Sequence, residues 1–166
     1  MWTYLIYLLF HILSAMIWVG GMIFYVIVVM PVIRNPKLRD QKITLLQLTA
    51  LQFRKISYSL FLIFLVSGFG ILYAKGYLID GQLVSFFTSN IGYMFLTKIF
   101  LFLVLFLSSL YHDFVSGPKT FLYLDQDSVQ YERYRKRSGF FGRFNLLLSV
   151  SIAILGILVS RGHSLF

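Results

Sequence analysis

The chain has 166 residues, of which 58% are hydrophobic and 13% are charged, and its net charge is +9. Soluble domains carry about 25% charged residues, so the composition argues against a water-soluble domain and predicts an integral membrane protein. The chain has no cysteine. Disulfides, iron–sulfur clusters, thiolate zinc or copper sites and cysteine catalysis are therefore excluded within it.

Four apolar stretches are long enough to cross a bilayer, which takes roughly 20 residues each. They cover about residues 3–30, 56–74, 90–112 and 142–160. The first has no basic start and is too long to be the apolar core of a secretory signal peptide. We therefore expect an all-α integral membrane protein, a four-transmembrane-helix bundle that forms a single domain over residues 1–166. No internal repeat is evident.

Basic residues gather in two of the three connections between these stretches. Residues 31–55 contain Arg34, Lys37, Arg39, Lys42, Arg54 and Lys55, and residues 113–141 contain Lys119, Arg133, Arg135, Lys136 and Arg137. Basic loops stay in the cytoplasm, so both termini should lie outside it, in a bacterial-type inner membrane. The positive charge thus indicates topology rather than nucleic acid binding. A short helix is expected within each loop, over about 32–55 and 125–137.

One face of the first apolar stretch is polar. Spacing of three or four residues places His11, Ser14, Ala15, Trp18, Met22 and Tyr25 on this face. A histidine costs free energy in hydrocarbon, so it normally faces the interior of a bundle. Lys98 interrupts the third stretch, and like His11 it should lie about eight residues, or roughly 12 Å, from the outer end of its helix. We therefore expect His11 and Lys98 to share an interior site in the outer half.

Three interpretations of this outer pair remain open. In the first, His11 is the axial ligand of a b-type haem, with Lys98 as second ligand, proton donor or propionate partner, and with Trp18, Gly21 and Met22 nearby. In the second, His11 binds copper with Met22 or His163. In the third, His11 and Lys98 bond only to backbone carbonyls, and the chain is a cofactor-free accessory subunit. The sequence has no nucleophile–base pair and no phosphate-binding loop that would indicate a hydrolase or a transferase.

A second polar group is expected at the inner end of the third and fourth stretches. It consists of His112, Asp113, Arg143 and Asn145, which should hold the two helices together by hydrogen bonds. His112 lies roughly 21 Å from Lys98 along the helix axis. His11 and His112 should therefore not bind the same small cofactor.

The motifs resemble those of a known family. His11-x-x-x-Ala15-x-x-Trp18-x-Gly20-Gly21 resembles the first helix of the copper-resistance D (CopD-like) membrane family, and His112-Asp113-Phe114-x-x-Gly117-Pro118 is similar to the exit of its third helix. Arg143-x-Asn145 is similar to the start of its last helix. The resemblance implies copper uptake or resistance, usually with a periplasmic partner. We also expect a protein partner or a homo-oligomer in the membrane.

The same pattern is distantly similar to the HemJ-type protoporphyrinogen oxidases. In that family a first-helix histidine, matched by His11, is implicated with haem, and a third-helix lysine, matched by Lys98, is functionally important. Those enzymes follow the arginine-x-asparagine step with glutamate and a nearby proline, where this chain has Leu146, Leu147 and Leu148. The resemblance therefore implies a haem protein for electron transfer or redox chemistry, and leaves open whether the chain is an enzyme.

Overall fold

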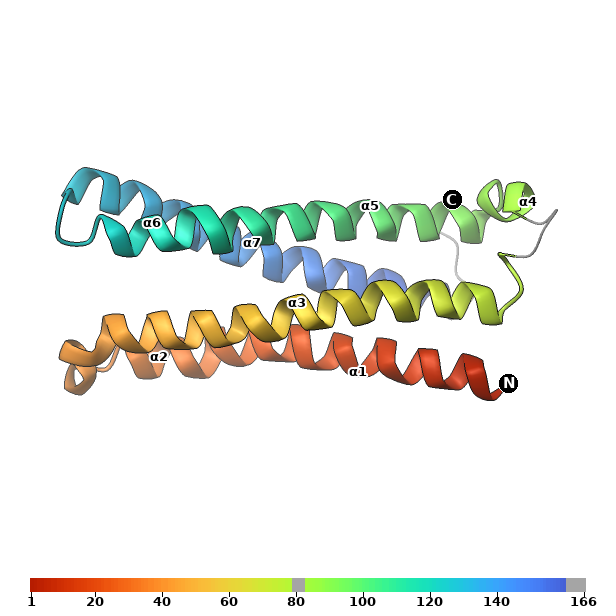
Figure 1. The fold of residues 1–166 in the computed structure, drawn as a ribbon, viewed down its shortest axis with the longest axis horizontal. Coiled ribbons are helices and arrows are strands. Elements are labelled where there is room, and N and C mark those ends of the chain that lie inside the picture. Colours follow the sequence, from red (N-terminus) through yellow and green to blue (C-terminus); the bar gives the residue numbers. More distant parts are fainter. Residues whose placement is uncertain (79–82, 161–166) are drawn as a thin grey trace. The chain divides into compact units, whose positions relative to one another are not determined.

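The computed structural model describes residues 1–78 and 83–160, which form helices and short connections without any strand. Four helical segments in these ranges are long and apolar enough to cross a membrane. They run over Trp2–Ile33, Pro36–Ala74, Asn90–Leu122 and Ser128–Ser160 (Figure 1). The prediction of an all-α chain with four such helices is confirmed.

The first compact unit, Met1–Tyr93, is a helical hairpin. Its first arm consists of α1 (Trp2–Phe24), the π-helix η1 (Tyr25–Val29) and α2 (Met30–Ile33). A 3-10 helix, η2 (Pro36–Gln41), leads into the returning helix α3 (Lys42–Ala74). A short helix, α4 (Leu83–Phe87), follows.

The second compact unit, from Met94 onward, contains most of α5 (Asn90–Tyr111). The π-helix η3 (His112–Ser116) and α6 (Gly117–Leu122) continue this arm. The chain then returns as α7 (Ser128–Ser160).

Small residues let α1 approach α3 closely. Gly70 lies so close to the Tyr7 ring that a Cβ atom there would overlap it, and a Cβ at Gly21 would lie 3.0 Å from the Phe53 ring. Backbones approach closely at such small residues in membrane helix pairs. Large apolar side chains such as Leu9, Ile17 and Leu62 remain exposed, as suits contact with lipid.

The first helical arm continues through Pro31, where the sequence favours a stop. In an α-helix, proline lacks the N–H group that bonds four residues back, and its ring clashes with that carbonyl. Here η1 precedes it, and the Met30 N–H donates to the Tyr25 carbonyl, five residues back. This wider turn re-pairs the backbone ahead of the proline. The π-helix η3 precedes Pro118 in the same way, and there the Gly117 N–H donates to the His112 carbonyl.

The short helices expected within the basic loops are continuous with the membrane helices. α3 already begins at Lys42 and α7 at Ser128. The carboxylate of Asp127 accepts from the N–H groups of Val129 and Gln130 and caps the start of α7. No proline follows within either helix, so nothing ends the helix before the apolar part begins.

The two units are built from the same series of helical elements. In each, a helix passes into a five-residue π-helix, then into a residue followed by proline, and the returning helix has 33 residues. Few residue types coincide between the arms, Pro31 and Pro118 among them. The similarity therefore lies in the backbone, which is why the sequence shows no repeat.

Replacing Gly70 by alanine should destabilise the first hairpin by about 1–3 kcal/mol, because the new methyl group overlaps the Tyr7 ring. Gly20→Ala is the matched control, since a Cβ at Gly20 meets nothing within 4 Å; it should be neutral or gain up to about 1 kcal/mol of helix propensity. Unfolding by titration with sodium dodecyl sulfate measures both variants. Equal stability of the two would contradict this account of the α1–α3 contact.

Candidate functional site

The imidazole of His11 on α1 is held by a serine of α3. His11 Nδ1 lies 2.9 Å from Oγ of Ser67, a side chain that is only 2% exposed. The Ser67 hydroxyl has one proton, and its shortest bond donates that proton to the Ile63 carbonyl at 2.5 Å. Ser67 Oγ therefore accepts from His11, so Nδ1 of the neutral ring carries the proton and Nε2 carries the lone pair.

The α3 surface around Ser67 also fixes the plane of the His11 ring. Phe64 meets the imidazole edge-on, with ring centroids 5.4 Å apart and an interplanar angle of 80°. A Cβ at Gly68 would lie 3.6 Å from His11 Cε1, so the ring rests on the α3 backbone. These contacts with α3 restrict the orientations open to the ring.

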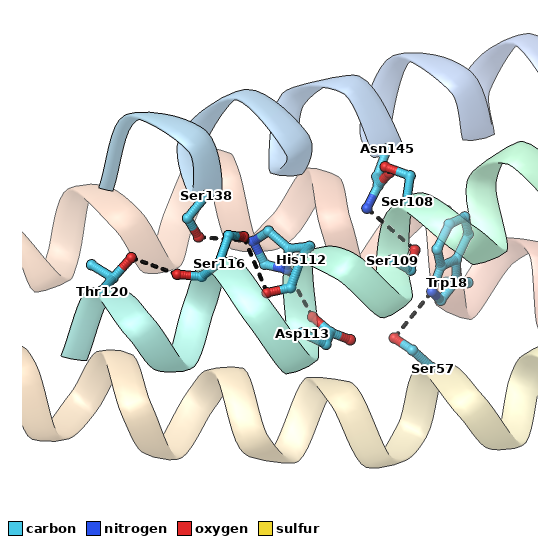
Figure 2. Close-up of polar contacts among 10 residues, drawn as sticks. All are labelled: Trp18, Ser57, Ser108, Ser109, His112, Asp113, Ser116, Thr120, Ser138 and Asn145. Carbon is cyan, nitrogen blue, oxygen red and sulfur yellow. Dashed lines mark hydrogen bonds and ion pairs between the residues drawn. The ribbon is translucent and has the colours of Figure 1, made fainter. Parts of the chain in front are cut away.

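Two further residues of the predicted site serve the contact between α1 and α3. The indole N–H of Trp18 donates to Ser57 Oγ at 3.1 Å (Figure 2), and the Trp18 ring packs against Phe61. Gly21 admits the Phe53 ring. Packing against α3 thus accounts for both residues. Met22 is half-exposed on α1.

Lys98 lies on α5, in the second unit. A Cβ at Gly156 of α7 would lie 3.3 Å from Lys98 Nζ, so the ammonium group rests on the α7 backbone where no side chain intervenes. Lys98 belongs to neither of the ion pairs His112–Asp113 and Glu132–Arg135.

Lys98 corresponds to His11 in the construction of its unit. Each residue stands fourteen positions before the first residue of the π-helix on its arm. Each also lies against a glycine of the returning helix, Gly68 for His11 and Gly156 for Lys98. The two residues singled out from the sequence thus hold equivalent places in the two hairpins.

A second histidine, His112, is bonded on both sides. Its Nδ1 lies 2.7 Å from Asp113 Oδ1, and its Nε2 lies 3.2 Å from Ser138 Oγ (Figure 2). With neutral imidazole, Nδ1–H donates to the carboxylate and the serine hydroxyl donates to Nε2. Ser138 was not predicted, although it shares a face of α7 with Gly142 and Asn145 at helical spacing.

The other residues of the predicted inner group are not in this histidine network. Asn145 is buried, and its side chain accepts from Ser108 at 2.5 Å and donates to Ser109 at 3.2 Å. Arg143 is exposed and donates to the Gly139 carbonyl of its own helix. Asn145 does link α5 to α7, through the two serines. His163 lies outside the described residues.

Within residues 1–78 and 83–160, no three His, Asp or Glu side chains lie close enough together to hold a bare metal ion. His11 offers a single imidazole nitrogen. One or two axial ligands are all that a protein supplies to an iron already held by a porphyrin.

Comparison with known proteins gives one relative of similar length. A protein of Aquifex aeolicus (strain VF5), described as uncharacterized, is 30% identical over 161 residues, which make up 95% of this chain and 96% of that protein. No family model matches the chain. No solved structure matches it either.

Proposed function

The chain belongs to the same family as this Aquifex aeolicus protein, and we propose that it is a membrane protein that binds a b-type haem through His11, assisted by Lys98, for electron transfer or redox chemistry. One observation carries the proposal. The bond from His11 Nδ1 to Ser67 assigns the lone pair to Nε2 of the neutral ring.

Histidines that bind metals usually donate their other ring N–H to a nearby acceptor, which fixes the tautomer and the orientation. Ser67 is such an acceptor, and it is itself held by the Ile63 carbonyl. The imidazole therefore loses little conformational freedom when it becomes a ligand. Phe64 adds an apolar wall that limits the access of water to the ring.

When bound, haem supplies one-electron iron chemistry. His11 Nε2 would hold the iron, and Ser67 would accept from Nδ1–H and orient the ring. Lys98 would act as second ligand, as proton donor or as the partner of a propionate. Within its own hairpin, Lys98 holds the place that His11 holds in the first, fourteen residues before the π-helix and against a glycine of the returning helix.

The proposal includes a topology, in which both termini lie outside the cytoplasm of a bacterial-type inner membrane. The basic ends of α3 and α7, which carry Arg54 and Arg137 among others, then face the cytoplasm.

The lack of native cysteine allows a direct test of this topology with single-cysteine variants. A membrane-impermeant maleimide should label Thr3→Cys in intact cells and should label Lys136→Cys only after lysis, since both positions are exposed in the structure. The reverse pattern would contradict the orientation. Labelling of both positions in intact cells would contradict the membrane-spanning arrangement.

Haem binding predicts a Soret band in the detergent-purified protein. His11→Ala should abolish the band, because it removes the axial ligand, and Lys98→Ala should weaken or shift it. His112→Gln is the matched control and should leave the band unchanged, since Asp113 and Ser138 engage that ring. Oxidised and reduced absorption spectra with elemental analysis measure all four proteins.

A colourless wild-type protein after expression with ample haem would overturn the haem proposal. Stoichiometric copper would then favour a copper-handling protein, using His11 with Met22 or His163. Neither haem nor copper, together with co-purification of a larger complex, would favour a cofactor-free accessory subunit.

A further inference from the structure

In the second unit, the cationic groups of two residues, Lys119 and Arg137, lie over the ring of Tyr134. Lys119 Nζ lies 5.2 Å from the centroid of the Tyr134 ring and 3.4 Å from its hydroxyl oxygen, to which it donates. The guanidinium carbon of Arg137 lies 5.7 Å from the same centroid. We call these three residues the Tyr134 cluster. All three are half-buried.

Neighbouring aromatic residues hold the Tyr134 cluster in place. Tyr123 stacks on the Tyr134 ring at 5.7 Å with an interplanar angle of 13°. Arg137 also donates to the hydroxyl of Tyr111 at 3.4 Å. Both cations therefore have aromatic partners before any ligand arrives, and restricting them in advance lowers the entropy cost of binding one.

The positive charge of the cluster is not neutralised by a carboxylate among the described residues. Neither cation belongs to the described ion pairs. Three acidic side chains near these residues in the sequence have other partners. Asp113 bonds to His112, Asp127 caps α7 and Glu132 pairs with Arg135. Both cations lie within 5.7 Å of the centroid of one ring. Like charges this near to one another repel, so an anion that contacts both would be stabilising.

Phosphate is the anion that best fits these groups. Guanidinium binds phosphate oxygens with paired N–H donors, and ammonium binds them as a point charge. Tyrosines typically lie at the level of lipid headgroups. Tyr134 and Arg137 lie on the basic part of α7, just before its apolar part begins, and Lys119 lies on α6. Lys and Arg near a membrane surface attract anionic lipid.

We propose that Lys119, Tyr134 and Arg137 form a binding site for the phosphate of an anionic lipid headgroup. The site is independent of any cofactor at His11.

The test uses the full-length protein purified in a neutral detergent. The apparent thermal-unfolding midpoint is followed during titration with dioleoylphosphatidylglycerol, with dioleoylphosphatidylcholine, or with inorganic phosphate. The variant Lys119→Gln/Arg137→Gln is compared with Arg133→Gln/Lys136→Gln. This control removes the same charge from exposed positions of α7 that have no part in the cluster.

Phosphatidylglycerol should raise the midpoint of the wild type and of the control variant at similar concentrations. The cluster variant should need at least about tenfold more lipid, because it loses both groups that would bind the headgroup phosphate, whereas the control variant keeps them. If the cluster variant does not purify folded, Lys119→Gln and Arg137→Gln are each compared with Lys136→Gln. Each should then need more phosphatidylglycerol than Lys136→Gln, by a smaller factor than the double variant.

Equal loss of lipid response in the cluster and control variants would overturn the proposal, because attraction would then depend on total charge alone. An equal response to phosphatidylcholine would overturn it as well. A response of the wild type to inorganic phosphate that matches phosphatidylglycerol would overturn the assignment to lipid and identify free phosphate as the occupant.

Discussion

The structure depends on one constraint: a polar group inside the apolar part of a membrane must find its partner within the protein. The polar side chains of α1 accordingly bond to serines of α3, His11 to Ser67 and Trp18 to Ser57. In the second unit Asn145 of α7 bonds to two serines of α5. Each bond joins the two arms of one hairpin. Together with the glycine contacts, these bonds define how each pair of helices meets.

The same constraint connects the fold to the proposed function. The Ser67 hydroxyl donates its hydrogen bond to the Ile63 carbonyl, one turn earlier in α3. Its oxygen is then left to accept from His11, so a bond that stabilises the hairpin also selects the tautomer of the imidazole. The equivalent place on the second hairpin carries Lys98 against Gly156. The chain thus presents one ring nitrogen and one ammonium group from equivalent positions.

Some of this architecture could be predicted from the sequence, and the reasons are physical. Composition and hydrophobic length predict four membrane-spanning helices, and the cost of a buried imidazole predicts that His11 has an interhelical partner. The identity of that partner could not be predicted, because serine residues such as Ser57, Ser67 and Ser138 lie on several helix faces. The continuation of the helix through Pro31 could not be predicted, because a π-helix has no clear sequence signal. The similarity of the two units could not be predicted from the sequence, because their backbones follow the same series of elements while their side chains differ.

The tautomer of His11 is the most direct test of this account. Solid-state NMR of haem-free protein labelled with nitrogen-15 histidine, assigned by His→Gln variants, reports which ring nitrogen carries a proton. The account predicts a neutral His11 ring with a protonated Nδ1 and an unprotonated Nε2, and predicts that Ser67→Ala removes this preference. A His11 ring protonated at Nε2, or one unaffected by Ser67→Ala, would contradict it.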